Sequence, residues 1–597
     1  MLSNLSFFSE FESKLLYGGS FSKEQISFID SFESCYFDAC PGSGKTTSLS
    51  MKIALLLKKL SDEGSTEGVC VITYTNVAVQ EIVKSLKSLG INSMRHPHFI
   101  GTINEFFNRY CVAPYLKKNF KCNTLNFIEE DSSANKYMNS SYRILLCNQN
   151  GWLRAKDKEG ILSAYASRAC NYPFMFDSST KELVLQNTDE WKKFEDARKW
   201  IEPVRMARLA KGYLRHAETF SISEAFLASS NHYSKIIAQR FRYVFVDEYQ
   251  DTNSLGTKLL FDLFNSSNHV FQLVGDPYQL IYETDFKKHI SIPTKHLSET
   301  KRFSQAIANP LNVIAGKKTI RSTNNLRNSH QPVLLLYKDP SKIPDAFSEI
   351  ISTFSENNNS FVSDVENSKI LVRLKAKTCD LFPSKKYVEK NNVSKGISTY
   401  QIKRNLDDLL INKIILNNPG QQYDKSILSE KIVNSEDYSL IIGELITFLI
   451  EKQGNSNSLV LSINNLLGKL SGGKINKNNR FIKYVLTFFD IAQEEKSSSL
   501  TSDDVFTIHS SKGETLKSVL IYGKGKTKNS DWEDLDDVLM ESYLKNGDTV
   551  FSEQDRNHLY VALSRTKYLN VYALPQEKFS DELYNKMKND WIFQSII

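Results

Sequence analysis

Short apolar runs that end in polar or glycine residues recur along this chain, and stretches with helical spacing separate them. The first run covers residues 35–39 and leads through a glycine turn into a helical pattern from Thr47 to Lys59. Apolar runs of this length, bounded by turn residues, predict buried strands, and their alternation with helices predicts parallel sheets. Further strands are predicted on the same grounds at residues 69–76, 100–104, 242–247, 270–275, 370–373, 505–509, 519–522 and 569–573.

Two long stretches interrupt this alternation. Residues 111–214 are charged and helical in pattern, without a phosphate loop or a glycine-rich turn. Residues 378–500 contain helical patterns such as Tyr438–Glu451, separated by turns rich in asparagine, glycine and lysine at 452–458 and 471–479. Both stretches are therefore predicted to be mainly helical inserted domains.

Composition narrows the class of protein. A chain of 597 residues is expected to hold about four domains. Its eight cysteines form no Cys-x-x-Cys pair, which argues against structural zinc, an iron–sulfur cluster and a disulfide framework. The net charge of +7 permits a polyanionic partner without requiring one. No basic region precedes the apolar residues of the N-terminus, and no apolar run approaches membrane-spanning length, so a soluble, cytoplasmic protein without a membrane partner is expected.

The glycine turn after the first strand has the pattern of a phosphate-binding loop. Ala39 stands where the leading glycine is usual, and Gly44, Lys45 and Thr46 complete the motif. The glycines let backbone N–H groups turn toward phosphate oxygens, Lys45 can reach the β- and γ-phosphates, and Thr46 can hold Mg²⁺. A chance glycine–serine turn is the alternative, but strand, loop and helix occur in the required order. The loop predicts binding of a nucleoside triphosphate.

Paired carboxylates follow the strand at residues 242–247. Asp247 is predicted to hold Mg²⁺, and Glu248 is predicted to be the base that orients water. The amide of Gln279 could sense the γ-phosphate, and Arg565 is the planar, permanently charged group that stabilises a transferring phosphoryl group. The amide of Gln25, which could instead be an ordinary solvated helix residue, could read an adenine edge.

Two further predictions concern two tyrosines near Gln279 and an acidic stretch near the C-terminus. Tyr278 or Tyr282 could stack on a base. The acids of residues 531–537 are most simply a solvated face.

Taken in order along the chain, these motifs resemble those of the UvrD/Rep/PcrA family of superfamily 1 helicases. Gln25 resembles the family's adenine-reading glutamine, residues 39–46 its Walker A loop, and residues 247–251 its Asp-Glu-x-Gln-Asp signature. Residues 275–279 resemble its coupling motif, and Arg302 and Arg565 match two arginines that reach the γ-phosphate.

The resemblance implies an α/β fold with two RecA-like P-loop motor domains and two mainly helical insertions. It implies RecA-like domain 1A at 1–110 and 215–298, insertion 1B at 111–214, RecA-like domain 2A at 299–377 and 501–597, and insertion 2B at 378–500. ATP with Mg²⁺ would bind between 1A and 2A and drive 3′-to-5′ movement on single-stranded or partly duplex DNA.

The resemblance also assigns residues to roles. The catalytic set is Lys45, Asp247, Glu248, Gln279, Arg302 and Arg565, with Thr46 and Asp247 as metal ligands. The cofactor-binding set is Gln25, Ala39, Cys40, Pro41, Gly42, Ser43, Gly44, Lys45, Thr46, Thr47, Arg302, Gly513, Glu514 and Arg565. The DNA-binding set is Thr75, Asn76, Thr102, Asn104, Tyr278, Tyr282 and His509.

Two departures from the family pattern leave alternatives open. Tyr282 is followed by Glu283-Thr-Asp-Phe286 rather than by a Gly-Trp-Arg-type sequence, and Glu514 adjoins Gly513 directly. The Lys-Gly-Glu-Thr form is similar to helicase-like subunits of anti-phage systems such as Gabija. One hypothesis is a stand-alone DNA helicase or translocase in repair or replication. A second is a nucleic-acid-sensing subunit that regulates a partner nuclease with weak or no unwinding, and a third is an RNA-directed motor.

Overall fold

The computed structural model describes most of the chain. The described residues are 2–127, 173–185, 202–281, 291–383 and 504–596, each range with short gaps, and parts of 406–417, 432–450, 456–476 and 482. Residues 1–381 with 503–597 form one compact unit, and residues 382–502 form a second. Among the described residues, no helix combines the length and the apolar composition that crossing a lipid bilayer requires.

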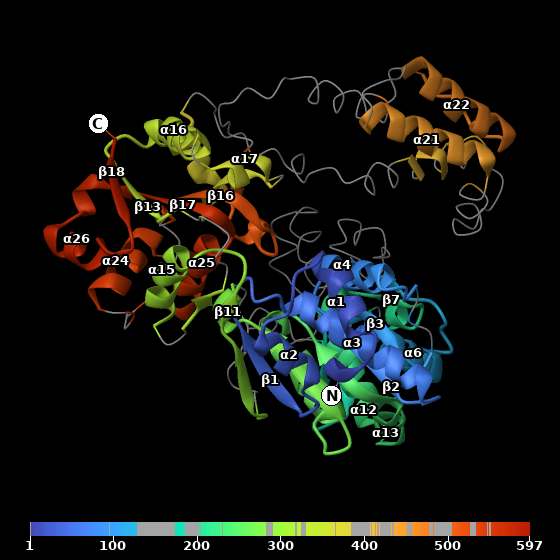
Figure 1. Cartoon of the computed structure of the whole chain (residues 1–597). Coiled ribbons are helices and arrows are strands. Elements are labelled where there is room, and N and C mark those ends of the chain that lie inside the picture. Colours follow the sequence, from blue (N-terminus) through green and yellow to red (C-terminus); the bar gives the residue numbers. More distant parts are fainter. Residues whose placement is uncertain are drawn as a thin grey trace, which may run out of the picture. The chain divides into compact units, whose positions relative to one another are not determined.

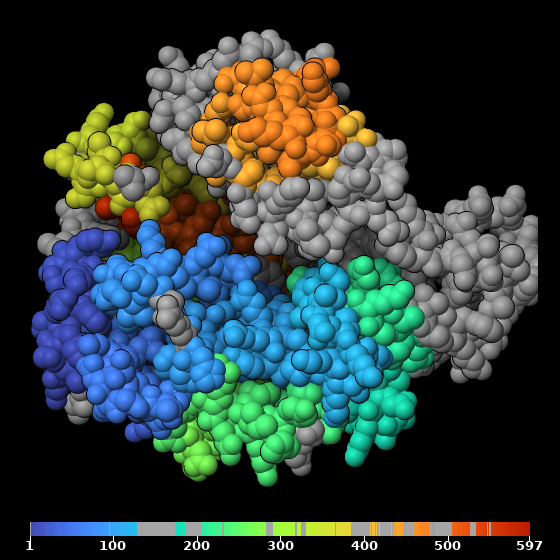
Figure 2. Space-filling view, turned by 90° about the vertical axis from the view of Figure 1, so that its right-hand side faces the viewer, coloured from blue at the N-terminus to red at the C-terminus, as the bar shows by residue number. Residues whose placement is uncertain are grey.

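The first unit contains two parallel sheets. The N-terminal sheet has the order β10-β1-β9-β8-β2-β3, and its neighbouring strands all pair in parallel. Its strands are β1 (Cys35–Ala39), β2 (Gly68–Thr73), β3 (Phe99–Thr102), β8 (Phe241–Val246), β9 (Val270–Gly275) and β10 (Thr294–Leu297). Because β8 and β9 lie between β1 and β2, segments about 200 residues apart in sequence share one domain. Figure 2 shows the same arrangement from outside, where the blue and green segments form one continuous surface.

Helices cover both faces of this sheet. Val69 and Val71 of β2 face a cluster built with α3 (Lys45–Asp62), whereas Cys70 and Ile72 face a second cluster with α5 (Ile103–Phe107). Successive side chains of a strand point to opposite faces, so a strand covered on both faces is apolar throughout. This burial explains why the strands appear in the sequence as continuous apolar runs.

The C-terminal sheet repeats the same strand order. It runs β18-β13-β17-β16-β14-β15, so that β13 takes the place of β1, β16 that of β8 and β17 that of β9. Its strands are β13 (Val333–Tyr337), β14 (Ser368–Val372), β15 (Val505–Thr507), β16 (Leu516–Tyr522), β17 (Thr566–Pro575) and β18 (Ile592–Ser595). Its neighbouring strands also pair in parallel throughout. Helices α15, α24, α25 and α26 lie on one side of it, and α16 and α17 lie on the other (Figure 1).

The other helices of the first unit connect and cover these strands. They are α1 (Phe8–Leu16), α2 (Lys23–Asp30), α4 (Asn76–Ser88), a π-helix η2 (Asn108–Val112), α6 (Ala113–Phe120), α12 (Thr219–Ala228), α13 (Asn231–Arg240), α14 (Ser254–Phe264), α15 (Gln305–Ala315), α16 (Ile343–Glu356), α17 (Asn359–Ser363), α18 (Thr378–Leu381), α24 (Leu535–Leu544), α25 (Glu553–Leu563) and α26 (Asp581–Met587). The mixed α/β fold with large parallel sheets agrees with the predicted fold class.

The described part of residues 111–214 is not only helical. It contains an antiparallel hairpin, β5 (Phe174–Asp177) and β6 (Glu182–Leu185), and a short parallel pair, β4 (Asn126–Phe127) and β7 (Tyr213–Leu214). Phe174, Leu183 and Leu185 are buried against Ile222 of α12. Each strand is only two to four residues long, which is too short for an alternating pattern to stand out among charged residues.

The second unit has its own apolar core. Helices α21 (Glu436–Ile450) and α22 (Ser456–Lys469) bury Ile441, Leu445, Ile463 and Leu467 together with Leu410. The buried positions within each helix are four residues apart, the spacing that places side chains on one helical face.

Candidate active site

The loop after β1 has the backbone that its glycines predict. Gly42 (φ 74°) and Gly44 (φ 73°) lie in the left-handed region, which residues with a Cβ atom rarely adopt. A Cβ at Gly42 would lie 2.3 Å from the Cβ of Arg302, and one at Gly44 would lie 2.6 Å from Nε2 of Gln25. Both glycines are therefore needed for conformation and for space. Helix α3 begins at Lys45, directly after the loop.

Three hydrogen bonds hold this loop from outside. Thr300 Oγ1 donates to the Pro41 carbonyl (2.8 Å), the Lys301 N–H donates to the Gly42 carbonyl (2.9 Å), and Gln25 Nε2 donates to the Ser43 carbonyl (2.8 Å). The other end of the Gln25 amide accepts the N–H of Ser22 in a capping box. The structure thus places Gln25, the predicted reader of adenine, against the loop backbone.

The two carboxylates lie at the end of β8, opposite the start of α3. Thr46 Oγ1 lies 3.3 Å from Oδ2 of Asp247, so a hydroxyl and a carboxylate face each other. Hard oxygen ligands of this kind suit Mg²⁺, which keeps several waters and takes its other ligands from phosphates. The residues present therefore fit the predicted metal.

Glu248 is held in an unusual backbone conformation. It has φ 50°, in the left-handed region, and its N–H donates to Oδ1 of Asp247 (3.0 Å). Gln250 Nε2 donates a short hydrogen bond to its carboxylate. A left-handed φ at a non-glycine residue is uncommon and is often part of a functional site.

The two neighbouring carboxylates, Asp247 and Glu248, differ in their tendency to ionise. Burial, and then the neighbouring charge of Glu248, raise the pKa of Asp247 to about 7. Burial opposes ionisation of Glu248 too, but Lys45 and the hydrogen bond from Gln250 outweigh it and hold the pKa of Glu248 below its usual value. Glu248 is therefore the anionic member of the pair, as a base that accepts a proton from water must be.

Gln279 and Arg565 join the two sheet domains. Gln279 Nε2 donates to Asp276 Oδ2 (2.9 Å), and its Oε1 accepts from Arg565 Nη2 (2.9 Å). Arg565 is 1% exposed and also donates to the carbonyls of Val561 (3.2 Å) and Glu514 (3.4 Å). Burial lowers the pKa of Arg565.

One cleft of about 740 Å³ in the first unit is lined by Lys45, Thr46, Glu248, Gln279 and Arg565, whereas Asp247 is buried and does not line it. The N-terminal sheet domain contributes its loop at 41–47, Glu248, Asp251 and Gln279, and the C-terminal part contributes Arg302, Arg565 and residues 509–510 and 512–515. Arg302 Nη1 donates to the carbonyl of Ser564 (2.9 Å). Of the predicted cofactor-binding residues, Gln25, Ala39 and Cys40 are buried behind this surface.

The described residues among those predicted to bind DNA lie on several helices, strands and turns of the first unit. Thr75 and His509 line the cleft just described, and Asn76 is exposed beside Thr75. Thr102 caps α5 by accepting the N–H of Glu105 (3.2 Å), and Asn104 lies one residue into that helix. The ring of Tyr278 packs 5.4 Å from that of Tyr560. Tyr282 lies outside the described residues.

Sequence reasoning missed several residues of the site. Lys512 Nζ lies 2.5 Å from Oδ1 of Asp251, and Lys369 Nζ lies 2.7 Å from Oε2 of Glu514. Asn557 of α25 donates to the backbone beside Gln279. Lys512 could have been found because it directly precedes the Gly-Glu of the recognised motif, whereas only the folded chain brings Asn557 to Gln279.

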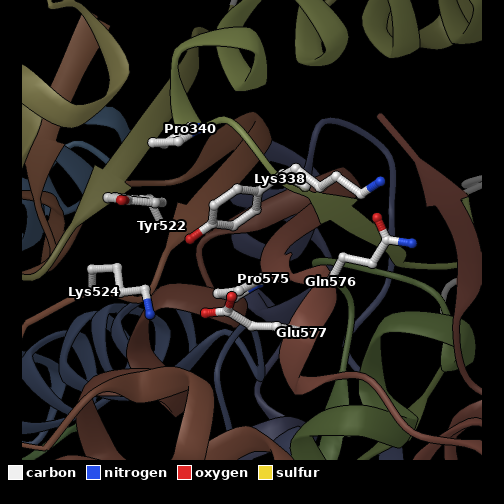
Figure 3. Close-up of a pocket in the computed structure, with 8 residues that line it drawn as sticks. Lys338, Pro340, Tyr522, Lys524, Pro575, Gln576 and Glu577 are labelled. Carbon is white, nitrogen blue, oxygen red and sulfur yellow. The ribbon is translucent and has the colours of Figure 1, made fainter. Parts of the chain in front are cut away.

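The C-terminal sheet has a pocket at the position that corresponds to this cleft. It measures about 540 Å³ and lies at the carboxyl ends of β13, β16 and β17, among Lys338, Tyr522, Lys524 and Glu577 (Figure 3). The loop after β13 contains Asp339 and no glycine. The Asp339 carboxylate accepts from the N–H (3.0 Å) and hydroxyl (2.8 Å) of Ser341, so an anion of the chain itself occupies the start of the following helix.

At the end of β16 the pocket has a cation, Lys524, where the cleft of the first sheet domain has carboxylates. The Lys524 ammonium lies 3.4 Å from Asp536 and 3.7 Å from Asp534. Asp536 is fully buried and accepts the hydroxyl of Tyr572 (3.0 Å). The prediction of a solvated acidic face over residues 531–537 is therefore wrong for Asp536, because the buried hydroxyl of Tyr572 and the partly exposed ammonium of Lys524 are partners for its carboxylate.

Comparison with known proteins agrees with these motifs. Residues 23–288 match the family model of the UvrD/REP helicase N-terminal domain. The chain is 24% identical to Gabija protein GajB of Bacillus cereus (strain VD045) over 597 residues, which cover 95% of this chain and 98% of that protein.

Two helicase II proteins match over a smaller part. A probable DNA helicase II homolog of Mycoplasma capricolum is 27% identical over 45% of this chain and 35% of its own length. DNA helicase II of Haemophilus influenzae is 24% identical over 52% of this chain and 41% of its own length. The match to these two relatives thus spans less than half of each.

Proposed function

The chain belongs to the UvrD-like helicases, and from this membership we propose that it hydrolyses ATP with Mg²⁺ and uses the energy to move 3′-to-5′ along single-stranded DNA. The observation that carries the proposal is the convergence of Lys45, Glu248 and Arg565 on one cleft between two parallel sheets. Each of the three supplies a different part of phosphoryl transfer to water.

The proposed chemistry assigns a task to each side chain. Lys45 binds the β- and γ-phosphates, and Thr46 and Asp247 hold the Mg²⁺, which neutralises charge on the phosphate oxygens. Glu248, oriented by Gln250, accepts the proton of the attacking water. Arg302 and Arg565 stabilise the negative charge that develops on the γ-phosphoryl group.

Coupling of hydrolysis to movement is proposed to run through Gln279. Its amide bonds Asp276 of the first sheet domain and Arg565 of the second. When the γ-phosphate binds or leaves, its interaction with Arg565 changes. This change would alter the hydrogen bond between Arg565 and Gln279 and would shift the populations of the open and closed cleft. Contacts to the DNA backbone would make binding weaken as salt rises.

The test is the ATPase rate with and without single-stranded DNA, together with strand separation on duplexes with a 3′ or a 5′ tail. We expect stimulation by DNA and unwinding only from the 3′ tail. Glu248→Gln keeps the shape of the side chain and removes the base, so turnover should fall about 10²-fold or more. Wild-type turnover in Glu248→Gln with saturating DNA would show that Glu248 is not the base.

A second candidate function is favoured by the alignment with Gabija protein GajB over nearly the full length of both chains. In this case the protein would sense nucleic acid and regulate a partner nuclease in anti-phage defence, with weak or no unwinding. Hydrolysis stimulated by DNA without strand separation, and co-purification with a nuclease from the native host, would support this function over the stand-alone helicase.

A further inference from the structure

The turn that carries Gln279 is held by a helix of the other sheet domain. This turn, η6 (Pro277–Gln279), follows β9, and α25 packs against it. Asn557 of α25 is 6% exposed, and its amide donates to the carbonyls of Pro277 (3.3 Å) and Leu280 (2.8 Å). A single side chain thus bonds the backbone on both sides of Gln279.

The same face of α25 makes a second contact with this region. Tyr560 lies three residues after Asn557, the spacing that places two side chains on one helical face, and its hydroxyl lies 3.4 Å from Oδ2 of Asp276. That oxygen also accepts the amide of Gln279. The backbone of the turn and the side chain of Gln279 are therefore both fixed relative to α25, the helix that ends two residues before Arg565.

We propose that Asn557 is a positioning residue for ATP hydrolysis: it holds the 277–280 turn on α25 so that Gln279 can hold Arg565 in the cleft. The proposal rests on the hydrolysis proposed above. Asn557 is not among the residues that line the cleft, so it acts through Gln279 and Arg565 and not on the nucleotide. A misplacement of about 1 Å at a reacting centre can cost ~10²-fold in rate.

A purely structural role is the competing explanation, because any buried amide that bonds a carbonyl adds stability. Asn570 of β17 provides the matched control. It is 1% exposed, and its Nδ2 donates to the carbonyl of Leu563 (2.8 Å), a contact that lies wholly within the C-terminal sheet domain. Asn570→Ala therefore measures how much the loss of a buried amide lowers kcat and the melting temperature when the turn at Gln279 is unchanged.

The experiment compares the full-length wild type with Asn557→Ala, Gln279→Ala, the double variant and Asn570→Ala. DNA-stimulated kcat, the Kd for a fluorescent ATP analogue and the melting temperature are measured for each. We expect Asn557→Ala to lower kcat about 10- to 100-fold with the Kd changed less than about 3-fold. In the Gln279→Ala background the same substitution should cost less than about 2-fold, because the two residues act as one unit.

Independent losses that multiply in the double variant would overturn the proposal. So would a loss of kcat in Asn570→Ala as large as that in Asn557→Ala. If Asn557→Ala does not fold, Asn557→Leu, which keeps the branched shape of the side chain but has no donor, replaces it in the same cycle. Absence of hydrolysis in the wild type would overturn the proposed function and this inference together, whereas wild-type hydrolysis that Asn557→Ala retains overturns the inference alone.

Discussion

The two sheet domains have one strand order but differ at the places where a nucleotide would bind. After β1 the loop has left-handed glycines and leads into Lys45, whereas after the corresponding β13 the loop has no glycine and Asp339 caps the helix. After β8 come Asp247 and Glu248, whereas after β16 come Gly523 and Lys524. The positions of the charges are therefore exchanged between the two domains. In the first domain the loop carries the cation, Lys45, and the strand end carries the carboxylates; in the second domain the loop carries the anion, Asp339, and the strand end carries the cation, Lys524. A shared topology therefore does not determine the ligand, which depends on a few side chains at the strand ends.

The largest effect, on the rate of hydrolysis, is expected at Arg565, which the second sheet domain contributes to the cleft. Arg565→Ala should slow hydrolysis about 10³-fold, in the range known for arginines that stabilise phosphoryl transfer, because Arg302 and Lys45 alone would leave part of the charge that develops on the γ-phosphoryl group unstabilised. Nucleotide binding should change little. Steady-state turnover and nucleotide titration check this, and equal loss of both would show that Arg565 serves folding instead.

A smaller effect, on stability, is expected at the ion pair between Lys512 and Asp251. Burial raises the pKa of Asp251 to about 6, while the Lys512 ammonium opposes the rise. In Lys512→Met this pKa should rise further, since the carboxylate loses its cation. A folded-state pKa above the unfolded value favours the folded state at low pH and loses that contribution as pH rises.

The Lys512→Met variant should therefore be about 3 kcal/mol less stable than the wild type near pH 8 and should recover part of this difference toward pH 5. Chemical denaturation at both pH values measures it. A deficit that does not change with pH would contradict the role assigned to the Asp251 carboxylate.

The smallest effect is expected at the buried pair of Tyr572 and Asp536, beside Lys524 of the pocket in the second domain. Tyr572→Phe removes the hydroxyl that bonds Asp536 and should cost about 1 to 2 kcal/mol of unfolding free energy. The ATPase rate should stay within about 2-fold of the wild type, because the nucleotide is expected to bind at the loop of the first sheet domain and not in this pocket. A selective loss of turnover with unchanged stability would instead link the pocket to the reaction.

The sequence predicted the sheets and the phosphate loop because both depend on local patterns. Strands buried on both faces appear as apolar runs, and the loop must have its glycines and Lys45 at fixed spacing. The contacts of Gln25, Asp536 and Asn557 could not be predicted in this way. Gln25 bonds Ser43, 18 residues away, Asp536 bonds Tyr572, 36 residues away, and Asn557 bonds Pro277, 280 residues away. The type of a single residue does not indicate a partner at such separations.

The number of nucleotides bound per chain tests the difference between the two sheet domains most directly. Equilibrium dialysis with a non-hydrolysable ATP analogue and Mg²⁺ should give one per wild-type chain, none above background for Lys45→Ala, and one for Lys338→Ala and for Lys524→Ala. Two nucleotides per wild-type chain, or binding that survives in Lys45→Ala and is lost in Lys524→Ala, would contradict the assignment of the nucleotide site to the first sheet domain.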